Sequence, residues 1–264
     1  MGIGLLFSLK FVHGFAPENS AEMEKNMKFQ YLLFDLDGTL TDPKEGICTS
    51  VQYALRSFGI DEPDLDKLTP FIGPPLKDSF MEIYGFDEKQ AEEAIGKYRE
   101  WFRPTGIFQN AIYPGIREML EKLKGQGKVL AVASSKPQVF VERILRHFEI
   151  YDYFTVIVGS ELDGRRGTKE EVVEEALRQL AEAGEEDKQA LKAEEPKKQA
   201  GMPAQQMAQT AMIGDRKFDV SGGKEHGLVT VGVTFGYAPE GELEAAGPDF
   251  LVDSVEELGR LLEE

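Results

Sequence analysis

The chain has 264 residues, of which 41% are hydrophobic, and a formal net charge of −17 at pH 7. This length and composition allow a sizeable core and fit one large domain, or a core domain with a smaller inserted one. The acidic charge and the lack of a basic stripe argue against a nucleic-acid polymer as a partner. The single cysteine, Cys48, rules out an internal disulfide framework and favours a reducing, cytoplasmic location.

Residues 1–26 precede the first clear element, and we leave them out of the predicted fold. Residues 2–16 are apolar but lack a basic start, so they make a poor signal peptide, and they are too short to span a membrane. Met27 stands immediately before the first convincing strand. We therefore interpret residues 1–26 as an extension, a tag or a misassigned start that is poorly ordered, and we expect no membrane partner.

Residues 31–34 are a short apolar run that ends in Asp35 and Asp37, followed by Gly38. Such a run predicts a buried strand that delivers both acids to the edge of a sheet. One Asp before a Gly is typical of a turn. Two acids so close repel each other, however, and burial makes their ionisation costly unless a cation neutralises them. The pair therefore favours a metal or phosphoryl site over a simple turn.

The next stretch, residues 43–110, has the pattern of several short helices. Apolar residues recur at helical spacing around Val51 and again around Tyr98, and prolines at 63, 70, 74, 75 and 104 interrupt the pattern. We expect a small helical domain that is inserted after the first strand and covers the strand ends as a cap.

From Tyr113 onward, helical patterns alternate with short apolar runs. Helices are predicted over residues 115–124 and 137–148, and strands at residues 129–133, 155–158, 210–213, 229–233 and 250–252. Continuously apolar strands separated by amphipathic helices indicate an α/β, Rossmann-like fold, in which helices cover both faces of a parallel sheet. Residues 27–42 and 111–264 would form this core, and ligands of such sheets bind at the carboxyl ends of the strands.

Residues 181–209 differ in composition from the rest of the core, being mostly Ala, Glu, Lys and Gln. We expect a flexible insertion here. The alternative is that the preceding helix continues into this segment and then gives way to a loop.

The strand at residues 129–133 is followed by Ser134 and Ser135. Ser135 is placed to cap the next helix, with Pro137 near its first turn and Gln138 completing a pattern like a capping box. A cap accounts for Ser135 but not for Ser134. We therefore expect Ser134 and the exposed amides to donate hydrogen bonds to an anion.

A third strand end is followed by a helix that begins near Lys169. Thr168 and Glu171 form a capping box, which puts Lys169 in the first helical turn, where a cation is unfavourable against the helix dipole. A lysine in that place favours a role in offsetting carboxylates and holding a phosphoryl group. An isolated surface lysine is the alternative.

The strand at residues 210–213 leads to Asp215, and Asp219 follows one turn later, so both side chains can face the same point. With Asp35 and the backbone carbonyl of Asp37 they would form an oxygen-rich site of the kind that Mg²⁺ prefers. The lack of a Cys and His cluster argues against zinc.

These segments together resemble the four ordered motifs of the haloacid dehalogenase-like (HAD) hydrolases, over residues 28–259. The motifs are Asp35-Leu36-Asp37-Gly38-Thr39-Leu40, Ser134, Lys169 and Gly214-Asp215-Arg216-Lys217-Phe218-Asp219. Residues 71–75 and 162–164 are similar to the phosphoglycolate phosphatase branch, and the residues around Lys169 are similar to its 5′-nucleotidase-like members. Residues 181–209 are longer than this branch usually needs.

The resemblance implies a role for each motif residue. Asp35 would attack phosphorus to form an aspartyl-phosphate, and Asp37 would protonate the leaving alcohol and then deprotonate water. Ser134 and Lys169 would hold the phosphoryl group, which makes these four residues the catalytic candidates. The candidate ligands of Mg²⁺ are Asp35, Asp37, Asp215 and Asp219. The candidate substrate-binding residues are Ser134, Ser135, Lys169, Gly38, Gly73 and Lys77, with Ile72, Pro74 and Arg103 as further positions in the cap.

The leading functional hypothesis is a magnesium-dependent phosphomonoesterase that acts on a small phosphorylated metabolite, such as phosphoglycolate or a nucleoside 5′-monophosphate. A phosphosugar mutase on the same fold and a catalytically idle binding module are the alternatives. A phosphate-release assay distinguishes the phosphomonoesterase from the mutase. The sequence leaves open whether the protein is a monomer or a homodimer.

Overall fold

The computed structural model describes residues 29–189 and 202–263. The core is a six-stranded sheet whose neighbouring strands are all parallel, in the order β5-β4-β1-β6-β7-β8. Its strands are β1 Tyr31–Phe34, β4 Val129–Pro137, β5 Val156–Ser160, β6 Thr210–Gly214, β7 Val229–Val233 and β8 Phe250–Val252. All six lie at the predicted positions, so the α/β, Rossmann-like fold is confirmed.

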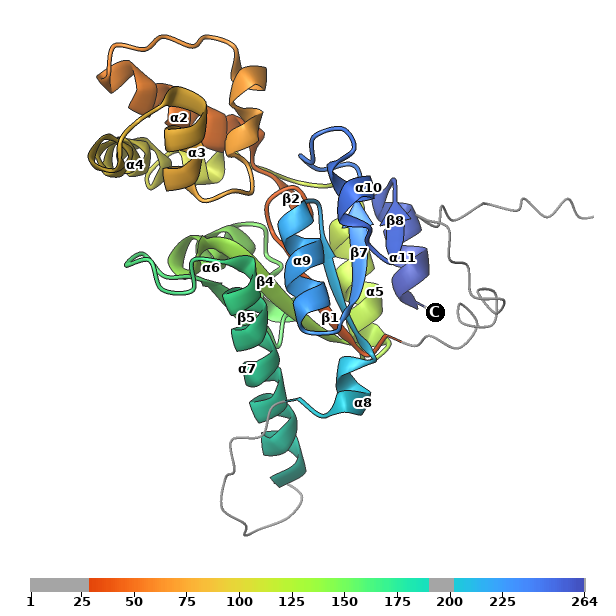
Figure 1. The fold of residues 1–264 in the computed structure, drawn as a ribbon. Coiled ribbons are helices and arrows are strands. Elements are labelled where there is room, and N and C mark those ends of the chain that lie inside the picture. Colours follow the sequence, from red (N-terminus) through yellow and green to blue (C-terminus); the bar gives the residue numbers. More distant parts are fainter. Residues whose placement is uncertain (1–28, 190–201, 264) are drawn as a thin grey trace, which may run out of the picture.

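Strand β1 lies inside the sheet and is buried on both faces. Leu32 and Phe34 belong to one apolar cluster and Leu33 to another, because successive strand residues point to opposite faces. Helices cover both clusters (Figure 1). On one face lie α5 Ile116–Gly125, α6 Gln138–His147 and α11 Val255–Glu263, and on the other lie α7 Lys169–Gln189 and α9 Lys217–Glu225.

A second group of helices lies at one end of the sheet (Figure 1). The chain enters it through β2 Thr41–Asp42 and leaves it through β3 Ala111–Ile112, which pair with each other in antiparallel fashion. This pair was not predicted, because two-residue strands are too short to show a periodicity. Between the two strands lie α2 Lys44–Ser57, η1 Leu65–Phe71, α3 Leu76–Tyr84, α4 Glu88–Phe102 and η2 Gly106–Phe108.

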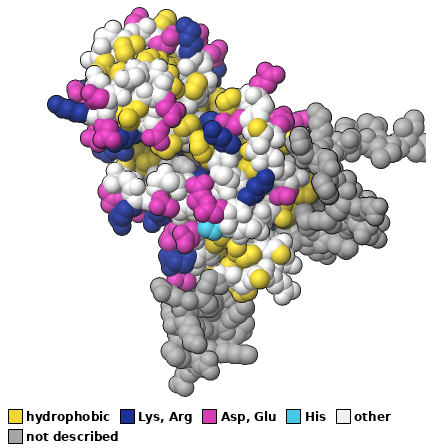
Figure 2. All heavy atoms as spheres, viewed as in Figure 1, with side chains coloured by type: hydrophobic (Ala, Val, Ile, Leu, Met, Phe, Trp, Pro, Cys, Tyr) yellow, Lys and Arg dark blue, Asp and Glu magenta, His cyan; other side chains and the backbone are white. Residues whose placement is uncertain are grey.

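Aromatic side chains hold this helical group together and join it to the sheet layers. Inside the group, the rings of Phe71 and Phe80 meet edge to face, with centroids 4.9 Å apart. At its boundary, Phe102 of α4 meets Phe140 of α6 in the same way, at 5.3 Å. Figure 2 shows acidic side chains on both parts of the visible face, in keeping with the net charge.

The remaining elements are η3 Tyr151–Tyr153, α8 Ala204–Met207 and α10 Glu242–Ala246. Helix α7 continues to Gln189, so the beginning of residues 181–209 extends the preceding helix. Residues 190–201 and the predicted extension at residues 1–26 lie outside the described residues. Within the described ranges, none of the helices combines the length and the apolar composition that crossing a bilayer requires.

Candidate active site

Asp35 and Asp37 follow β1 directly and are nearly inaccessible, with 5% and 7% of their surfaces exposed. Lys169 reaches Asp35 and Asp219 from the first turn of α7. Its Nζ lies 2.8 Å from Asp35 Oδ1 and 2.7 Å from Asp219 Oδ1, and it donates a hydrogen bond of 2.9 Å to the carbonyl of Ala133. Burial alone would lower the pKa of Lys169, but the Asp219 and Asp35 carboxylates raise it. The lysine therefore stays charged among the acids.

The local sequence of α7 places this lysine as predicted. Thr168 Oγ1 accepts a hydrogen bond from the backbone N–H of Glu171, and a carboxylate oxygen of Glu171 accepts one from the backbone N–H of Thr168, both at 3.3 Å. This reciprocal pair is the expected capping box. The alternative of an isolated surface lysine is wrong, because Lys169 is only 5% exposed.

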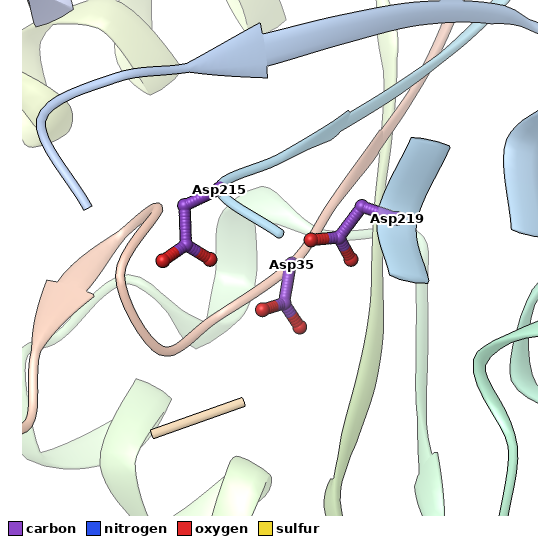
Figure 3. A group of neighbouring side chains, drawn as sticks. All are labelled: Asp35, Asp215 and Asp219. Carbon is purple, nitrogen blue, oxygen red and sulfur yellow. The ribbon is translucent and has the colours of Figure 1, made fainter. Parts of the chain in front are cut away.

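Three buried carboxylates, those of Asp35, Asp215 and Asp219, gather around one space (Figure 3). One oxygen from each lies within 4.8 Å of the others. Asp215 Oδ2 accepts a hydrogen bond of 2.7 Å from the backbone N–H of Tyr237, whereas Asp215 Oδ1 has no hydrogen-bond partner among the described residues. Burial raises the pKa of Asp215 well above its usual range, and it raises the pKa of Asp219 to about 6.

This carboxylate group fits a divalent cation. Its donors are all oxygen atoms, which suits Mg²⁺ better than a metal that prefers nitrogen or sulfur. A bound cation would offset the repulsion among the buried acids and would give Asp215 Oδ1 a partner. The backbone carbonyl of Asp37, the fourth expected ligand, stays a prediction.

Gly38 allows the loop after β1 to approach Asp215. Its φ of +84° lies in the left-handed region, and a Cβ at this position would lie 2.1 Å from Asp215 Oδ2. Only glycine can therefore occupy this place while Asp215 keeps its position. The residue was predicted to bind substrate, and the structure places it against a candidate metal ligand.

The side chain of Asp37 has a partner that the sequence analysis missed. Lys136 Nζ forms a buried ion pair with Asp37 Oδ2 and lies 5.1 Å from the ring centroid of Phe102 in α4. Burial raises the pKa of Asp37, although Lys136 opposes the shift. A raised pKa suits a carboxyl group that gives and takes a proton. The sequence contained a signal for this contact. Lys136 is a cation that directly follows Ser134 and Ser135, the two polar candidates at the end of the predicted strand.

Ser134 and Ser135 occupy different environments. Ser134 is buried and lines the cavity beside Asp35. The predicted cap by Ser135 is wrong, because β4 continues to Pro137, which pairs with Ser160 after a register shift. Helix α6 then begins without a side-chain cap. Pairing with the neighbouring strand overrides the local capping pattern.

These side chains open into a cavity of about 270 Å³ between the sheet edge and the helical group. Its lining includes the catalytic candidates Asp35, Asp37, Ser134 and Lys169, together with Ser135 and the predicted cap residues Gly73, Pro74 and Lys77. Lys77 Nζ lies 3.7 Å from carboxylate oxygens of Glu88 and Glu92, which are exposed. Ile72 is fully buried, and Arg103 is exposed and does not line the cavity.

A cation of α4, Arg99, lines the cavity and was not predicted. It stands four residues before Arg103, at helical spacing from Ile95 and Phe102, which also line the cavity. The sequence contained a signal for Arg99, because this cation stands within the apolar, inward-facing stripe of an amphipathic helix.

Arg216 ties the sheet edge to the helical group and was also missed. Its guanidinium donates to the backbone carbonyl of Ile72 and forms an ion pair of 2.7 Å with Glu242 of α10, and both side chains are largely buried. Gly73 makes the approach possible, because a Cβ there would lie 2.8 Å from a guanidinium nitrogen of Arg216. The contact joins the loop after Asp215 to the cavity wall.

Comparison with known proteins agrees with this geometry. The family model described as "Haloacid dehalogenase-like hydrolase" matches residues 32–233. A 5′-nucleotidase of Pseudomonas aeruginosa is 45% identical over 237 residues, which cover 90% of this chain and 97% of that protein. The tyrosine-protein kinase PtkA of Mycobacterium tuberculosis is 38% identical over 208 residues, 79% of this chain and 63% of the kinase.

Solved structures show the same likeness. The crystal structure of a predicted phosphatase from Clostridium acetobutylicum superposes with a TM-score of 0.74 and is 43% identical, covering 90% of this chain and 100% of the other. The four motifs meet at one sheet edge, as the resemblance requires. The chain belongs to the haloacid dehalogenase-like hydrolase family and is one of its phosphatases.

Proposed function

We propose that the protein is a magnesium-dependent phosphomonoesterase that hydrolyses a nucleoside 5′-monophosphate, or another small phosphate ester of similar size, through an aspartyl-phosphate. One observation carries this proposal: Lys169 holds Asp35 beside the Asp215 and Asp219 carboxylates, and Asp37 lies two residues away on the same strand end. A nucleophile, an acid and base, a cation and a metal site thus share one cavity.

In the first step, Asp35 attacks phosphorus, and the bond between phosphorus and the leaving oxygen breaks. Asp37 gives its proton to that oxygen, so that an alcohol leaves. Ser134 and Lys169 hold the phosphoryl group in line with both carboxyl groups. The raised pKa of Asp37, caused by its burial, favours the protonated form that this step needs.

In the second step, water attacks the phosphorus of the aspartyl-phosphate. Asp37, now ionised, takes the proton of that water, and the bond between phosphorus and the Asp35 oxygen breaks to release inorganic phosphate. Lys136 pairs with the ionised form of Asp37 between the two steps. The chain thereby returns to its starting protonation state.

Asp35, Asp215 and Asp219 would hold the Mg²⁺ ion. When bound, the ion would neutralise negative charge on the phosphoryl oxygens. Lys169 contributes a second positive charge, since it contacts Asp35 and Asp219 directly.

The helical group, residues 43–110 in our division of the chain, would act as the cap that covers the leaving group. Aromatic side chains line the cavity on both sides, Tyr98 and Phe102 from α4 and Phe140 and Phe218 from the sheet layers. This lining and the volume of about 270 Å³ suit a nucleoside better than the small glycolate group. A cytoplasmic location stays a prediction from the single cysteine.

The test is a phosphate-release assay with nucleoside 5′-monophosphates, phosphoglycolate and sugar phosphates, each with and without Mg²⁺. We expect Mg²⁺-dependent release that is lost in Asp35→Asn, a change that keeps the shape of the side chain and removes the nucleophile. Undiminished activity in that variant would contradict the proposal. Conversion of a sugar phosphate without phosphate release would indicate a mutase, and the lack of any turnover would indicate a binding module.

A further inference from the structure

Helix α4 turns one face toward the cavity. Ile95, Tyr98, Arg99 and Phe102 all line it, at the spacing of three and four residues that brings side chains to one side of a helix. The end of this face at Phe102 lies close to the proposed acid and base, since Lys136 contacts both the Phe102 ring and Asp37. The face therefore extends from Asp37 along the cavity wall.

Arg99 lies one helical turn before Phe102, which places it about 5 Å further along the helix axis. In the proposed reaction, Asp37 protonates the oxygen of the leaving group. A side chain one turn beyond the contact at Phe102 then faces the leaving group and not the transferred phosphoryl group, which Ser134 and Lys169 hold.

Arg99 differs from the other cations of the cavity in its partners. Among the described residues, four of the five cationic side chains in the lining have a carboxylate within 4.0 Å, namely Lys77, Lys136, Lys169 and Arg216. The structure gives the half-buried guanidinium of Arg99 no hydrogen bond and no acidic partner within the described part of the chain. Burial and the neighbouring Arg103 both lower the pKa of Arg99, so its charged form lacks compensation.

We propose that Arg99 is a specificity-determining residue that binds an oxygen acceptor on the leaving group of the substrate, either a nucleobase carbonyl or a carboxylate. A guanidinium can only donate hydrogen bonds, and a partly desolvated one gains most from an acceptor that is anionic or strongly polar. This inference rests on the proposed phosphatase function, and it adds which feature of the leaving group the cap recognises.

The experiment compares kcat/KM for three esters: uridine 5′-monophosphate, which carries carbonyl groups, phosphoglycolate, which carries a carboxylate, and phenyl phosphate, whose leaving group has no further acceptor. Arg99→Met should lower kcat/KM by about 10- to 100-fold for at least one of the first two, the usual effect of a lost charged hydrogen bond, and leave phenyl phosphate within about threefold. The ester that is affected identifies the acceptor. Arg99→Lys should recover part of the loss.

Arg103→Met is the matched control, because it removes the same charge from the residue that directly follows the same helix, outside the cavity lining. It should leave kcat/KM for all three esters nearly unchanged. An equal loss for all three esters in Arg99→Met, or no loss for any, would overturn the inference while the phosphatase function stands. Wild-type protein that releases no phosphate from any ester would overturn the proposed function, and the inference with it.

Discussion

Lys169 and Asp35 stand 134 residues apart in the chain, yet the Nζ of one lies 2.8 Å from a carboxylate oxygen of the other, and both are almost fully buried. The pair joins the end of β1 to α7, the helix that follows the edge strand β5. Because Lys169 also contacts Asp219, one cation compensates two buried carboxylates. The charge balance of Asp35 and Asp219 thus depends on a single side chain when no metal is bound.

Replacement of Lys169 by Met should therefore destabilise the metal-free protein strongly. Removing one partner from a buried ion pair leaves an uncompensated charge, at a cost of about 3–5 kcal/mol. Mg²⁺ should restore part of this loss, because it would neutralise the same carboxylates. The free energy of unfolding in urea, with and without Mg²⁺, measures both effects. Lys97→Met removes an exposed pair with Glu100 and should change little; an equal effect of the two changes would contradict the role given to Lys169.

Asp37→Asn should slow hydrolysis according to the leaving group. An alkyl alcohol such as the 5′-hydroxyl of a nucleoside needs a proton as it departs, whereas 4-nitrophenolate leaves without one. We expect a loss of kcat of about 100-fold or more for a nucleotide and a smaller loss for 4-nitrophenyl phosphate. Steady-state kinetics on both substrates measure the difference. An equal loss for both would indicate that Asp37 acts only by position.

Mg²⁺ should raise the melting temperature of the wild-type protein in a concentration-dependent way. A ligand that binds only the folded state stabilises it by RT ln(1 + [L]/Kd), about 2.7 kcal/mol at 100 times Kd. Asp215→Asn should abolish most of the shift, since Asp215 Oδ1 is a buried oxygen without a hydrogen-bond partner among the described residues, which a metal would satisfy. Thermal denaturation with Mg²⁺ and with EDTA tests this. Full stabilisation by Mg²⁺ in the variant would place the metal elsewhere.

The strand ends could be predicted from the sequence because the apolar runs that precede them are local and continuous. Asp35, Ser134, Lys169 and Asp215 followed from this pattern and the motif resemblance. Contacts made across the sheet edge could not, because they depend on how loops from different strands meet. Strand β4 continues past Ser135 to pair with β5, and Lys136, which lies on this extension, pairs with Asp37. The same extension explains why the predicted cap at Ser135 is wrong. The local sequence has the pattern of a cap, but the residues after Ser135 are still part of the strand.

The contacts between the helical group and the sheet layers could not be predicted from the sequence either. Arg216 stood within a recognised motif, but its partners, the carbonyl of Ile72 and the carboxylate of Glu242, lie 144 and 26 residues away. Unless it is known how the helical group lies against the sheet layers, the sequence does not show whether an arginine beside Asp215 is buried and paired or exposed to solvent. Arg99 needed the same information, since a cation on a helix is normally exposed.

Cys48 should resist thiol reagents in the folded protein. Its side chain is fully buried in α2, and burial raises the pKa of the thiol to about 12. Because the thiolate is the reactive form, both the raised pKa and the lack of access keep the reaction slow at pH 8. A coloured disulfide reagent should therefore modify the native protein at the rate of its unfolding, and the protein in guanidinium within minutes. Rapid modification of the native protein would show that α2 opens readily.

Gly73→Ala should destabilise the contact between the helical group and the sheet edge. Gly73 has a φ of +105°, and an added Cβ would lie 2.8 Å from a guanidinium nitrogen and 3.0 Å from Cγ of Arg216. Gly59→Ala is the matched control, because Gly59 also has a positive φ, +74°, but has no atom within 4 Å of the added Cβ. The control should lose about 1–2 kcal/mol of stability from backbone strain alone, and Gly73→Ala should lose a further 1–3 kcal/mol or so from the clash.

The two variants should also differ in catalysis. Displacement of Arg216 would release the carbonyl of Ile72 and loosen the loop at residues 71–75, which lines the cavity. We expect KM for a nucleoside 5′-monophosphate to rise in Gly73→Ala and to stay unchanged in Gly59→Ala. Urea unfolding and steady-state kinetics on the same preparations measure both quantities. Equal losses of stability with equal KM values would mean that Arg216 moves aside freely, and that the cavity wall does not depend on its bond to Ile72.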